Sequence, residues 1–163
     1  MENITCCFTG QRDISENKCK QLPIRLAKEI GKLIDCGVER FYTGGSSVFD
    51  IMSAEVVLKL REEFSHIKLI FVLSCREQAR GLRGERMETH KKILRKADEV
   101  ICTSESYDSQ CAYRRSRYMV ENSGFCVCFM EEGCYDIDVN RYMMNYARGK
   151  DLRVINLAQG FML

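Results

Sequence analysis

Short apolar runs alternate with longer amphipathic segments along the whole chain. The apolar runs predict six strands, at 3–8, 38–42, 67–73, 99–103, 125–130 and 152–157. The run at 67–73 is too apolar to alternate with polar positions, which indicates a strand covered on both faces, as in a parallel sheet. Strands that alternate with helices at this spacing predict right-handed crossovers. We therefore expect an α/β fold that is Rossmann-like and doubly wound, with a mainly parallel sheet and helices on both faces.

Helical periodicity occurs between the predicted strands. Helices are predicted over about 22–34, from the central glycine turn to near 63, over 111–120 and over 135–148. Pro23 suits a first helical turn, and Gly37 suits the position just after a helix end. Residues 76–88 are charged, contain two glycines and show weak periodicity. We expect them to form a mobile surface loop or lid that leads into a helix ending near Ala97.

The stretch 41–50 is the most informative part of the sequence. It reads Phe-Tyr-Thr-Gly-Gly-Ser-Ser-Val-Phe-Asp, an apolar strand followed by two glycines, two serines and a helix start. Gly44 and Gly45 can take positive φ and let a ligand approach the main chain closely. A helix N-terminus offers N–H groups to an anion. This layout favours a phosphate cradle, and a tight turn before a helix is the alternative interpretation.

A second turn of similar design follows the first predicted strand, at residues 9–12 (Thr-Gly-Gln-Arg). In open α/β sheets ligands bind beyond the carboxyl ends of the strands, where the strand order reverses. The residues expected to line such a site are Thr9, Gly10, Gln11, Arg12, Thr43, Gly44, Gly45, Ser46, Asp50, Cys75, Ser104, Arg114 and Glu131. Neither turn reads GxxxxGK[ST] or GxGxxG, which argues against a P-loop triphosphatase and a dinucleotide-binding domain.

Several charged residues have two interpretations. Asp50, one turn into the second predicted helix, either complements the helix dipole or holds a loop or a ligand hydroxyl. Arg114 and Arg117 lie three residues apart on one predicted helix face, with Arg115 turned away. That face is either a solvated basic surface or a part of the site.

Composition and charge narrow the class of protein. The chain has 163 residues, 45% hydrophobic and 29% charged, so we expect one globular domain over residues 1–163. The net charge of +2 gives no reason to expect nucleic-acid binding. No apolar run approaches the roughly 20 residues of a spanning helix, and no secretory signal is recognisable at the start. We expect a cytoplasmic protein without membrane contact.

The ten cysteines resemble core residues more than a metal or disulfide framework. No CxxC pair occurs, and His66 and His90 have no cysteine at ligand spacing. Cys126 and Cys128 would point to one face of a strand. We therefore expect free cysteines, no metal site and no cofactor.

A family resemblance rests on four motifs in order. They are residues 7–12 (Cys-Phe-Thr-Gly-Gln-Arg), 41–50, 96–101 (Lys-Ala-Asp-Glu-Val-Ile) and 114–120 (Arg-Arg-Ser-Arg-Tyr-Met-Val). Over nearly the whole chain, they resemble the YpsA-like branch of the SLOG superfamily, whose relatives include Lonely-Guy phosphoribohydrolases and the DNA-binding competence protein DprA. The resemblance implies a bacterial or phage Rossmann-like domain that binds or processes nucleotide-derived molecules. It places Thr9, Gly10, Arg12, Gly44, Gly45 and Asp50 in the pocket.

The chain departs from that family pattern at several positions. Gln11 and Asp13 stand where the family usually has histidine and proline, and Val48 stands where it has a third glycine. Residues 132–138 replace a G-G-T turn, and the Lonely-Guy signature P-G-G-x-G-T-x-x-E is absent. These departures favour a binding protein over an enzyme.

Three functions follow as hypotheses. The first is a sensor or sequestering domain for a nucleotide-derived small molecule. The second is N-glycosidic cleavage of nucleoside 5′-monophosphates, with Glu131 or Glu132 as the acid; adjacent strand residues face opposite ways, so the two do not form a dyad. The third is a protein-interaction module with a vestigial pocket.

We also expect a homodimer. The resemblance implies pairing through helices that flank the site. The last predicted helix carries more large apolar residues than one core-facing stripe requires, namely Tyr135, Val139, Tyr142, Met143 and Tyr146.

Overall fold

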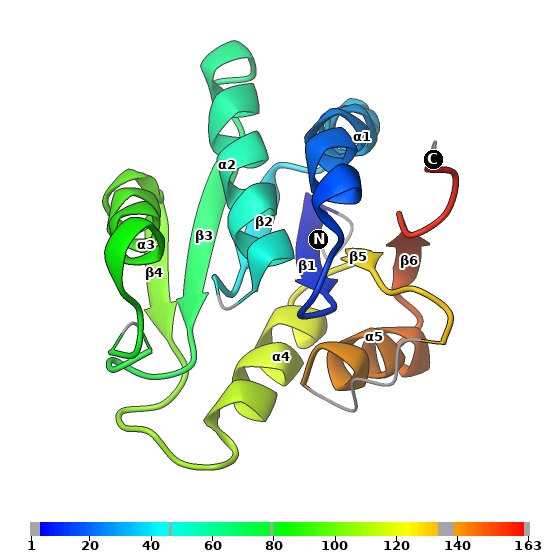
Figure 1. Cartoon of the computed structure of the whole chain (residues 1–163). Helices are drawn as coiled ribbons and strands as arrows, with labels where there is room; N and C mark the ends of the chain where they lie inside the picture. Colours follow the sequence, from blue (N-terminus) through cyan, green and yellow to red (C-terminus); the bar gives the residue numbers. More distant parts are fainter. Residues whose placement is uncertain (1–3, 46, 79, 134–138, 162–163) are drawn as a thin grey trace.

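A computed structural model describes residues 4–45, 47–78, 80–133 and 139–161 of the protein. Within these residues six strands and five helices alternate along the chain (Figure 1). The strands are β1 (Thr5–Gly10), β2 (Arg40–Thr43), β3 (Lys68–Leu73), β4 (Glu99–Cys102), β5 (Phe125–Phe129) and β6 (Arg153–Asn156). The helices are α1 (Glu16–Asp35), α2 (Val48–Glu63), α3 (Gly84–Lys96), α4 (Cys111–Glu121) and α5 (Val139–Gly149).

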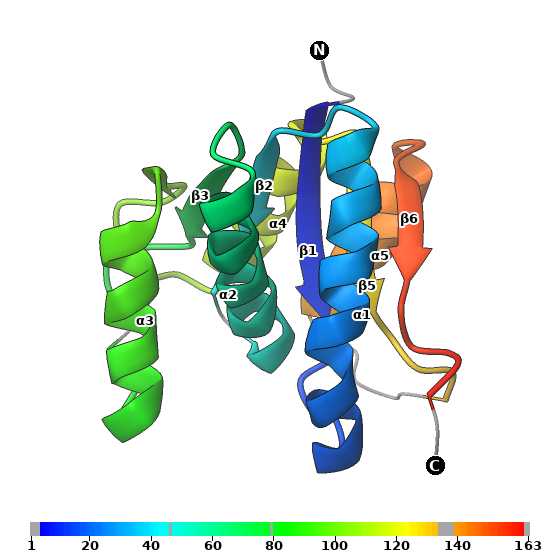
Figure 2. The ribbon, with the colours of Figure 1, turned by 90° about the horizontal axis from the view of Figure 1, so that it is seen from above.

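The strands form one parallel sheet in the order β4-β3-β2-β1-β5-β6. Helices α1, α2 and α3 cover one face, and α4 and α5 cover the other (Figure 2). The predicted doubly wound, Rossmann-like α/β fold is therefore confirmed. The chain moves outward from β1 to β4 on one side and then crosses to β5 on the other side of β1.

Alternate residues of each central strand enter two separate cores. Cys6 and Phe8 of β1 pack beneath the three-helix layer, whereas Cys7 packs beneath α4 and α5. In the same way Phe71 faces the first layer and Val72 the second. Both faces of the sheet are covered, which explains why these strands read as continuous apolar runs.

The start of α1 differs from the prediction, which placed Pro23 in the first helical turn. The helix begins at Glu16, because Ser15 caps it by accepting a hydrogen bond from the Lys18 N–H, and Pro23 lies well inside. Residues 16–21 are mostly polar, so the apolar periodicity starts later than the helix. Its end was predicted correctly, since Gly37 follows the C-cap with φ of 99°.

Two further boundaries differ from the sequence prediction. The loop expected over 76–88 is shorter, because α3 already begins at Gly84. The last helix, expected over 135–148, is described from Val139 to Gly149. Tyr135, named for the expected dimer surface, lies outside the described residues. None of the helices in the described part of the chain is long and apolar enough to cross a membrane.

Candidate functional site

The reversal of strand order lies between β1 and β5. β1 pairs with β2 on one side and with β5 on the other. Crossovers that leave this point in opposite directions open a crevice at the carboxyl ends of the two strands. Residues after β1 and β5 therefore lie where the fold favours a ligand.

Gln11 joins the two strand ends at this crevice. Its backbone N–H donates to the Phe129 carbonyl at 2.9 Å, and its side-chain Nε2 donates to Glu131 Oε1 at 2.8 Å. The Glu131 N–H donates to Gln11 Oε1 at 2.7 Å. The glutamine that replaces the family's usual histidine is thus a buried bridge between the ends of β1 and β5.

Glu131 also forms an ion pair with Lys18 of α1. The hydrogen bond from Lys18, supported by that from Gln11, lowers the pKa of the Glu131 carboxyl below its ordinary value. A carboxyl group with a lowered pKa is ionised at neutral pH. The Glu131 carboxylate can therefore accept hydrogen bonds from a ligand, but it is a poor proton donor.

The other residues of the first turn have separate roles. The Thr9 hydroxyl lies 3.3 Å from both the backbone and the side-chain oxygen of Asn140 in α5. A Cβ on Gly10 would lie 2.5 Å from Phe49 Cβ, so close packing of α2 on β1 requires glycine here. Arg12, the residue after Gln11, is exposed. The structure thus brings Gln11 and Glu131 together, and it directs Thr9 toward α5.

The second glycine turn packs against the core. Gly45 has φ of 66°, and a Cβ there would lie 2.3 Å from Phe71 Cζ. The Thr43 hydroxyl donates to the Asp50 carbonyl at 3.0 Å. Ser46, expected in the cradle, lies outside the described residues. The tight-turn interpretation therefore explains Gly45 and Thr43 without a ligand.

Arg115 lies on a different helix face from Arg114 and Arg117, and its buried side chain contacts this turn. Its side chain is 4% exposed, and Nη1 lies 3.1 Å from Gln78 Oε1 and 3.4 Å from the Gly44 carbonyl. Gln78 Nε2 also donates to the Gly44 carbonyl at 2.8 Å. The loop predicted to be a mobile lid is thus hydrogen-bonded to the turn through Gln78.

Asp50 is buried near the same guanidinium. Burial lowers the pKa of Arg115, and the nearby Asp50 carboxylate acts in the opposite direction. The sequence does contain a signal for the burial of Arg115, because Cys111, Arg115 and Met119 are spaced four residues apart on one helix face. In the structure all three are buried. The flanking arginines at 114 and 117 conceal that stripe.

Cys75, Ser104 and Arg114 lie away from the crevice, near β3 and β4. Burial raises the pKa of the Cys75 thiol, which therefore stays protonated. Arg114 Nε donates to Ser104 Oγ at 2.9 Å, and its Nη2 lies 2.5 Å from Asp108 Oδ2. The sheet order separates this group from Glu131, so the predicted residues form two groups rather than one site.

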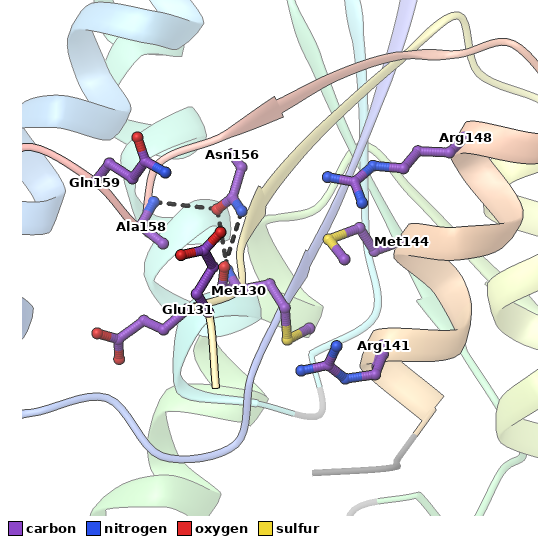
Figure 3. Close-up of a pocket in the computed structure, with 9 residues that line it drawn as sticks. Met130, Glu131, Arg141, Met144, Arg148, Asn156, Ala158 and Gln159 are labelled. Atoms are coloured by element: carbon purple, nitrogen blue, oxygen red, sulfur yellow. Dashed lines mark hydrogen bonds between the residues drawn. The ribbon is translucent and has the colours of Figure 1, made fainter. Parts of the chain in front are cut away.

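A cavity of about 460 Å³ opens at the carboxyl ends of β5 and β6, against α5 (Figure 3). We call it the switch-point cavity; its lining residues are Met130, Glu131, Glu132, Arg141, Met144, Arg148, Asn156, Ala158 and Gln159. Only Glu131 among them was a predicted ligand-binding residue. Arg141 and Arg148 were missed, although their spacing places them about two turns apart on one helix face.

Asn156 holds the floor of the switch-point cavity. Its Oδ1 accepts from the N–H groups of Met130 and Ala158, each at 3.1 Å. Its Nδ2 donates to the Met130 carbonyl at 2.8 Å. These three bonds tie the ends of β5 and β6 to each other, so the floor of the cavity is built from fixed backbone.

A second cavity, of about 420 Å³, lies between α2 and α3 beside the glycine turn. Gly45 and Ser47 border it, and Leu82 and Ile51 give it a mainly apolar wall. Its position away from the strand reversal makes it the weaker candidate. Among the described residues, no group of three or more His, Cys, Asp or Glu side chains is arranged to hold a metal.

Comparison with solved structures gives a DNA processing protein A from Helicobacter pylori, described for its single-stranded DNA binding mode. The TM-score is 0.68 at 16% identity, and the match covers 98% of this chain and 67% of that one. At this identity the match establishes a shared fold.

Curated relatives are UPF0398 proteins of bacteria. That of Lysinibacillus sphaericus is 26% identical over 110 residues, which are 66% of this chain and 62% of the relative. That of Halalkalibacterium halodurans is 31% identical over 108 residues, or 64% of this chain and 57% of the relative. The match therefore spans about three fifths of each relative's length.

The sequence model of the YspA SLOG family matches residues 10–155. This range contains most of the first turn, the whole of the second, Arg115 and α5. The match confirms the resemblance found in the sequence motifs. The chain belongs to the YspA SLOG family.

Proposed function

We propose that this protein binds a nucleotide-derived small molecule in the switch-point cavity. The observation that carries this proposal is the position of the cavity, at the strand ends beside the reversal of strand order. Its volume of about 460 Å³ falls within the range of about 300–1,000 Å³ found for small-molecule sites. Ligands of doubly wound sheets bind where the strand order reverses, here between β1 and β5, and Glu131 of the cavity is hydrogen-bonded to Gln11 at the end of β1.

The lining suits a ligand with hydroxyl and phosphate groups. Carboxylates of Glu131 and Glu132 can accept hydrogen bonds from ribose hydroxyls, and Gln159 can both donate and accept. Arginine side chains supply positive charge on the opposite wall (Figure 3). Membership of the SLOG family also supports a nucleotide-derived ligand.

Binding is favoured over N-glycosidic cleavage with Glu131 as the acid. A general acid that works near neutral pH needs a raised pKa, whereas the pKa of Glu131 is lowered by Lys18 and Gln11. Ribose phosphate release from nucleoside 5′-monophosphates would reverse this preference.

Single-stranded DNA is the second candidate ligand, because the Helicobacter pylori neighbour is described as binding it. The low net charge of +2 weighs against extended phosphate contacts. An oligonucleotide therefore belongs in every binding experiment as a competitor.

The test begins with native mass spectrometry of the purified protein, followed by calorimetry with the compound that co-purifies and with a nucleotide panel. Ala158→Phe fills the switch-point cavity and should abolish binding. Ala27→Phe is the matched control, because Ala27 lines a separate cavity between α1 and α2. Equal binding by the parent protein and Ala158→Phe, with both folded by circular dichroism, would place the ligand elsewhere. Failure of every nucleotide to bind at millimolar concentration would favour the protein-interaction alternative.

We further propose that the protein is a cytoplasmic homodimer that pairs through α4 and α5. The tyrosines expected at that surface are engaged within the chain: Tyr142 packs against Tyr113 and Tyr146, with ring centroids 5.0 and 5.8 Å away. Arg117 Nη1 lies 3.3 Å from the Tyr142 hydroxyl. These rings remain half-buried, so a partner could cover them. Light scattering at micromolar concentration should give twice the monomer mass of 18.9 kDa; the monomer mass would contradict the dimer.

A further inference from the structure

The segment that follows β6 forms part of the wall of the switch-point cavity. We call residues 157–161 the strap. Ala158 and Gln159 line the cavity, and Figure 3 shows them on the side opposite to the side chains of α5. Leu157 is buried, and its N–H donates to the Cys128 carbonyl at 2.8 Å. The inner end of the strap is therefore joined to β5.

The outer part of the strap has few restraints. The Ala158 N–H donates to Asn156 Oδ1 at 3.1 Å, but residues 159–161 form no hydrogen bond with any residue that the structure describes. Gly160 has φ of 81°, a region open to glycine. A segment with few hydrogen bonds opens at a low cost in free energy. The packing of Phe161 therefore decides whether the outer part stays in place.

The half-buried ring of Phe161 docks against β5 and α1. Its centroid lies 5.7 Å from that of Phe129, with the two rings edge to face. Arg25 Cζ lies over the ring at 4.5 Å from its centroid, and Lys18 Nζ at 5.8 Å. A cation within about 6 Å of a ring centroid is attracted to the ring face. One ring thus contacts both the core and two cations of α1.

The same two cations also hold other parts of the cavity wall. Arg25 Nη1 donates to the Leu157 carbonyl at 2.6 Å, so one side chain holds the strap at its inner end and at Phe161. Lys18 pairs with Glu131, which lines the cavity. The docking of Phe161 is therefore linked through α1 to a carboxylate that faces the ligand.

We infer that the strap is a movable wall of the switch-point cavity and that Phe161 is the latch that holds it. Gln159 lies between the anchored Leu157 and the latch, so its place in the cavity lining depends on docking of the ring. A ligand that contacts Gln159 binds the docked form more tightly and shifts the strap toward that form. This inference rests on the proposed function, because it adds how the same cavity closes on its ligand.

Tryptophan fluorescence tests the latch, because the chain contains no tryptophan. Phe161→Trp places a single indole at the latch and keeps the attraction to the two cations. Quenching of this indole by acrylamide should be weak. It should rise about twofold or more when Arg25→Gln is added, because the ring then loses a cation and the Leu157 carbonyl loses its donor.

Phe64→Trp is the matched control. Phe64 is also half-buried and packs against the same core, but it lies at the C-cap of α2, just before β3 begins. Arg25→Gln should leave the quenching of this reporter unchanged. The latch is overturned if Arg25→Gln does not change the quenching of Phe161→Trp, with both proteins folded by circular dichroism. An equal rise in both reporters also overturns it, since the whole protein would then have loosened.

Hydrogen exchange gives a second measurement that needs no tryptophan. The Leu157 and Ala158 amides should be protected in the parent protein, because both donate hydrogen bonds. Arg25→Gln should speed their exchange about tenfold, since it frees the strap for local opening. Unchanged exchange would overturn the link between Arg25 and the strap.

The ligand arm uses AMP and ADP as probes, and it separates the two proposals. A nucleotide that binds should reverse most of the rise in quenching that Arg25→Gln causes in Phe161→Trp. If calorimetry shows nucleotide binding and this quenching does not change, nucleotide binding stands and the movable wall is wrong. If neither nucleotide binds while Arg25→Gln exposes the Phe161→Trp indole, the movable strap stands and binding of these nucleotides is wrong.

Discussion

Glycines 10 and 45 are required by neighbouring phenylalanine rings. Each lies where an added Cβ would be less than 3 Å from a ring or its stem, Phe49 for Gly10 and Phe71 for Gly45. Both rings are fully buried. At the scale of single residues, the packing of α2 and β3 therefore explains the two glycines, and a loss of binding in variants at these positions would not identify a ligand contact.

Gly45→Ala should destabilise the protein by about 1–3 kcal/mol, because the added methyl group overpacks the core and a non-glycine residue is strained at positive φ. Urea unfolding followed by circular dichroism measures the effect. Gly31→Ala is the control: it lies in α1 with nothing within 4 Å of its Cβ, so it should be stabilising by up to about 1 kcal/mol. Equal stability of the Gly45→Ala variant and the parent protein would contradict this account.

Arg115 also has a role that depends on its burial. Arg115→Met should cost about 3 kcal/mol or more, because it leaves the buried Asp50 carboxylate without the nearby positive charge. Arg114→Met, at a half-exposed position paired with exposed Asp108, should cost less than about 1 kcal/mol. Urea unfolding of the two variants should therefore differ clearly, and equal losses would show that burial of Arg115 has no energetic consequence.

At the scale of elements, one polar cluster joins the start of α1 to the ends of β1 and β5. Lys18 reaches Glu131 from α1, and Gln11 reaches the same carboxylate from the end of β1. This cluster holds three elements at the point where the strand order reverses. It gives the cavity one fixed wall before any ligand binds.

The pH dependence of stability should report this cluster. The pKa of Glu131 in the folded protein lies below its ordinary value of 4.5. Its contribution to stability is therefore fully present above about pH 4.5 and is lost as the pH falls through the lower, folded-state pKa. The stability difference between the parent protein and Glu131→Gln should be present at pH 7 and should disappear in strong acid. In a Lys18→Met background that difference should shrink at pH 7; an unchanged difference would mean that Lys18 does not stabilise the carboxylate.

At the scale of the whole molecule, the two sides of the sheet have different cores. The side under α4 and α5 contains three cysteines and four methionines among its buried residues: Cys7, Cys126, Cys128, Met119, Met130, Met143 and Met144. Burial raises the pKa of Cys128 to about 12. All nine cysteines in the described part of the chain are free.

Thiol labelling should therefore follow global unfolding. In native protein at pH 8, Cys36 and Cys102 should react rapidly with a thiol reagent because they are exposed. Cys7, Cys126 and Cys128 should react only as fast as the sheet opens, and they should become fully reactive in denaturant. Mass spectrometry of labelled peptides separates the two classes. Rapid native labelling of Cys126 would contradict the burial of β5.

The sequence by itself determined the layers of this fold and the family. Apolar runs of strand length that alternate with helical periodicity allow few arrangements besides a doubly wound parallel sheet, because both faces of each central strand must be covered. Turn residues such as Gly37 follow from local backbone geometry. The four motifs in their order, at 7–12, 41–50, 96–101 and 114–120, were sufficient for the resemblance to the SLOG superfamily, which the family match over residues 10–155 confirms.

Only the tertiary structure decided which side chains meet. Glu131 and Lys18 are far apart in the sequence, and their contact depends on β5 lying beside β1. The sequence placed Arg115 on a different helix face from Arg114 and Arg117 but gave it no role, because burial of a charge is decided by what packs around it. Arg141 and Arg148 border a cavity because the end of β6 approaches α5. Strand order and helix packing bring these distant segments together, so the local periodicity of the sequence does not predict their contacts.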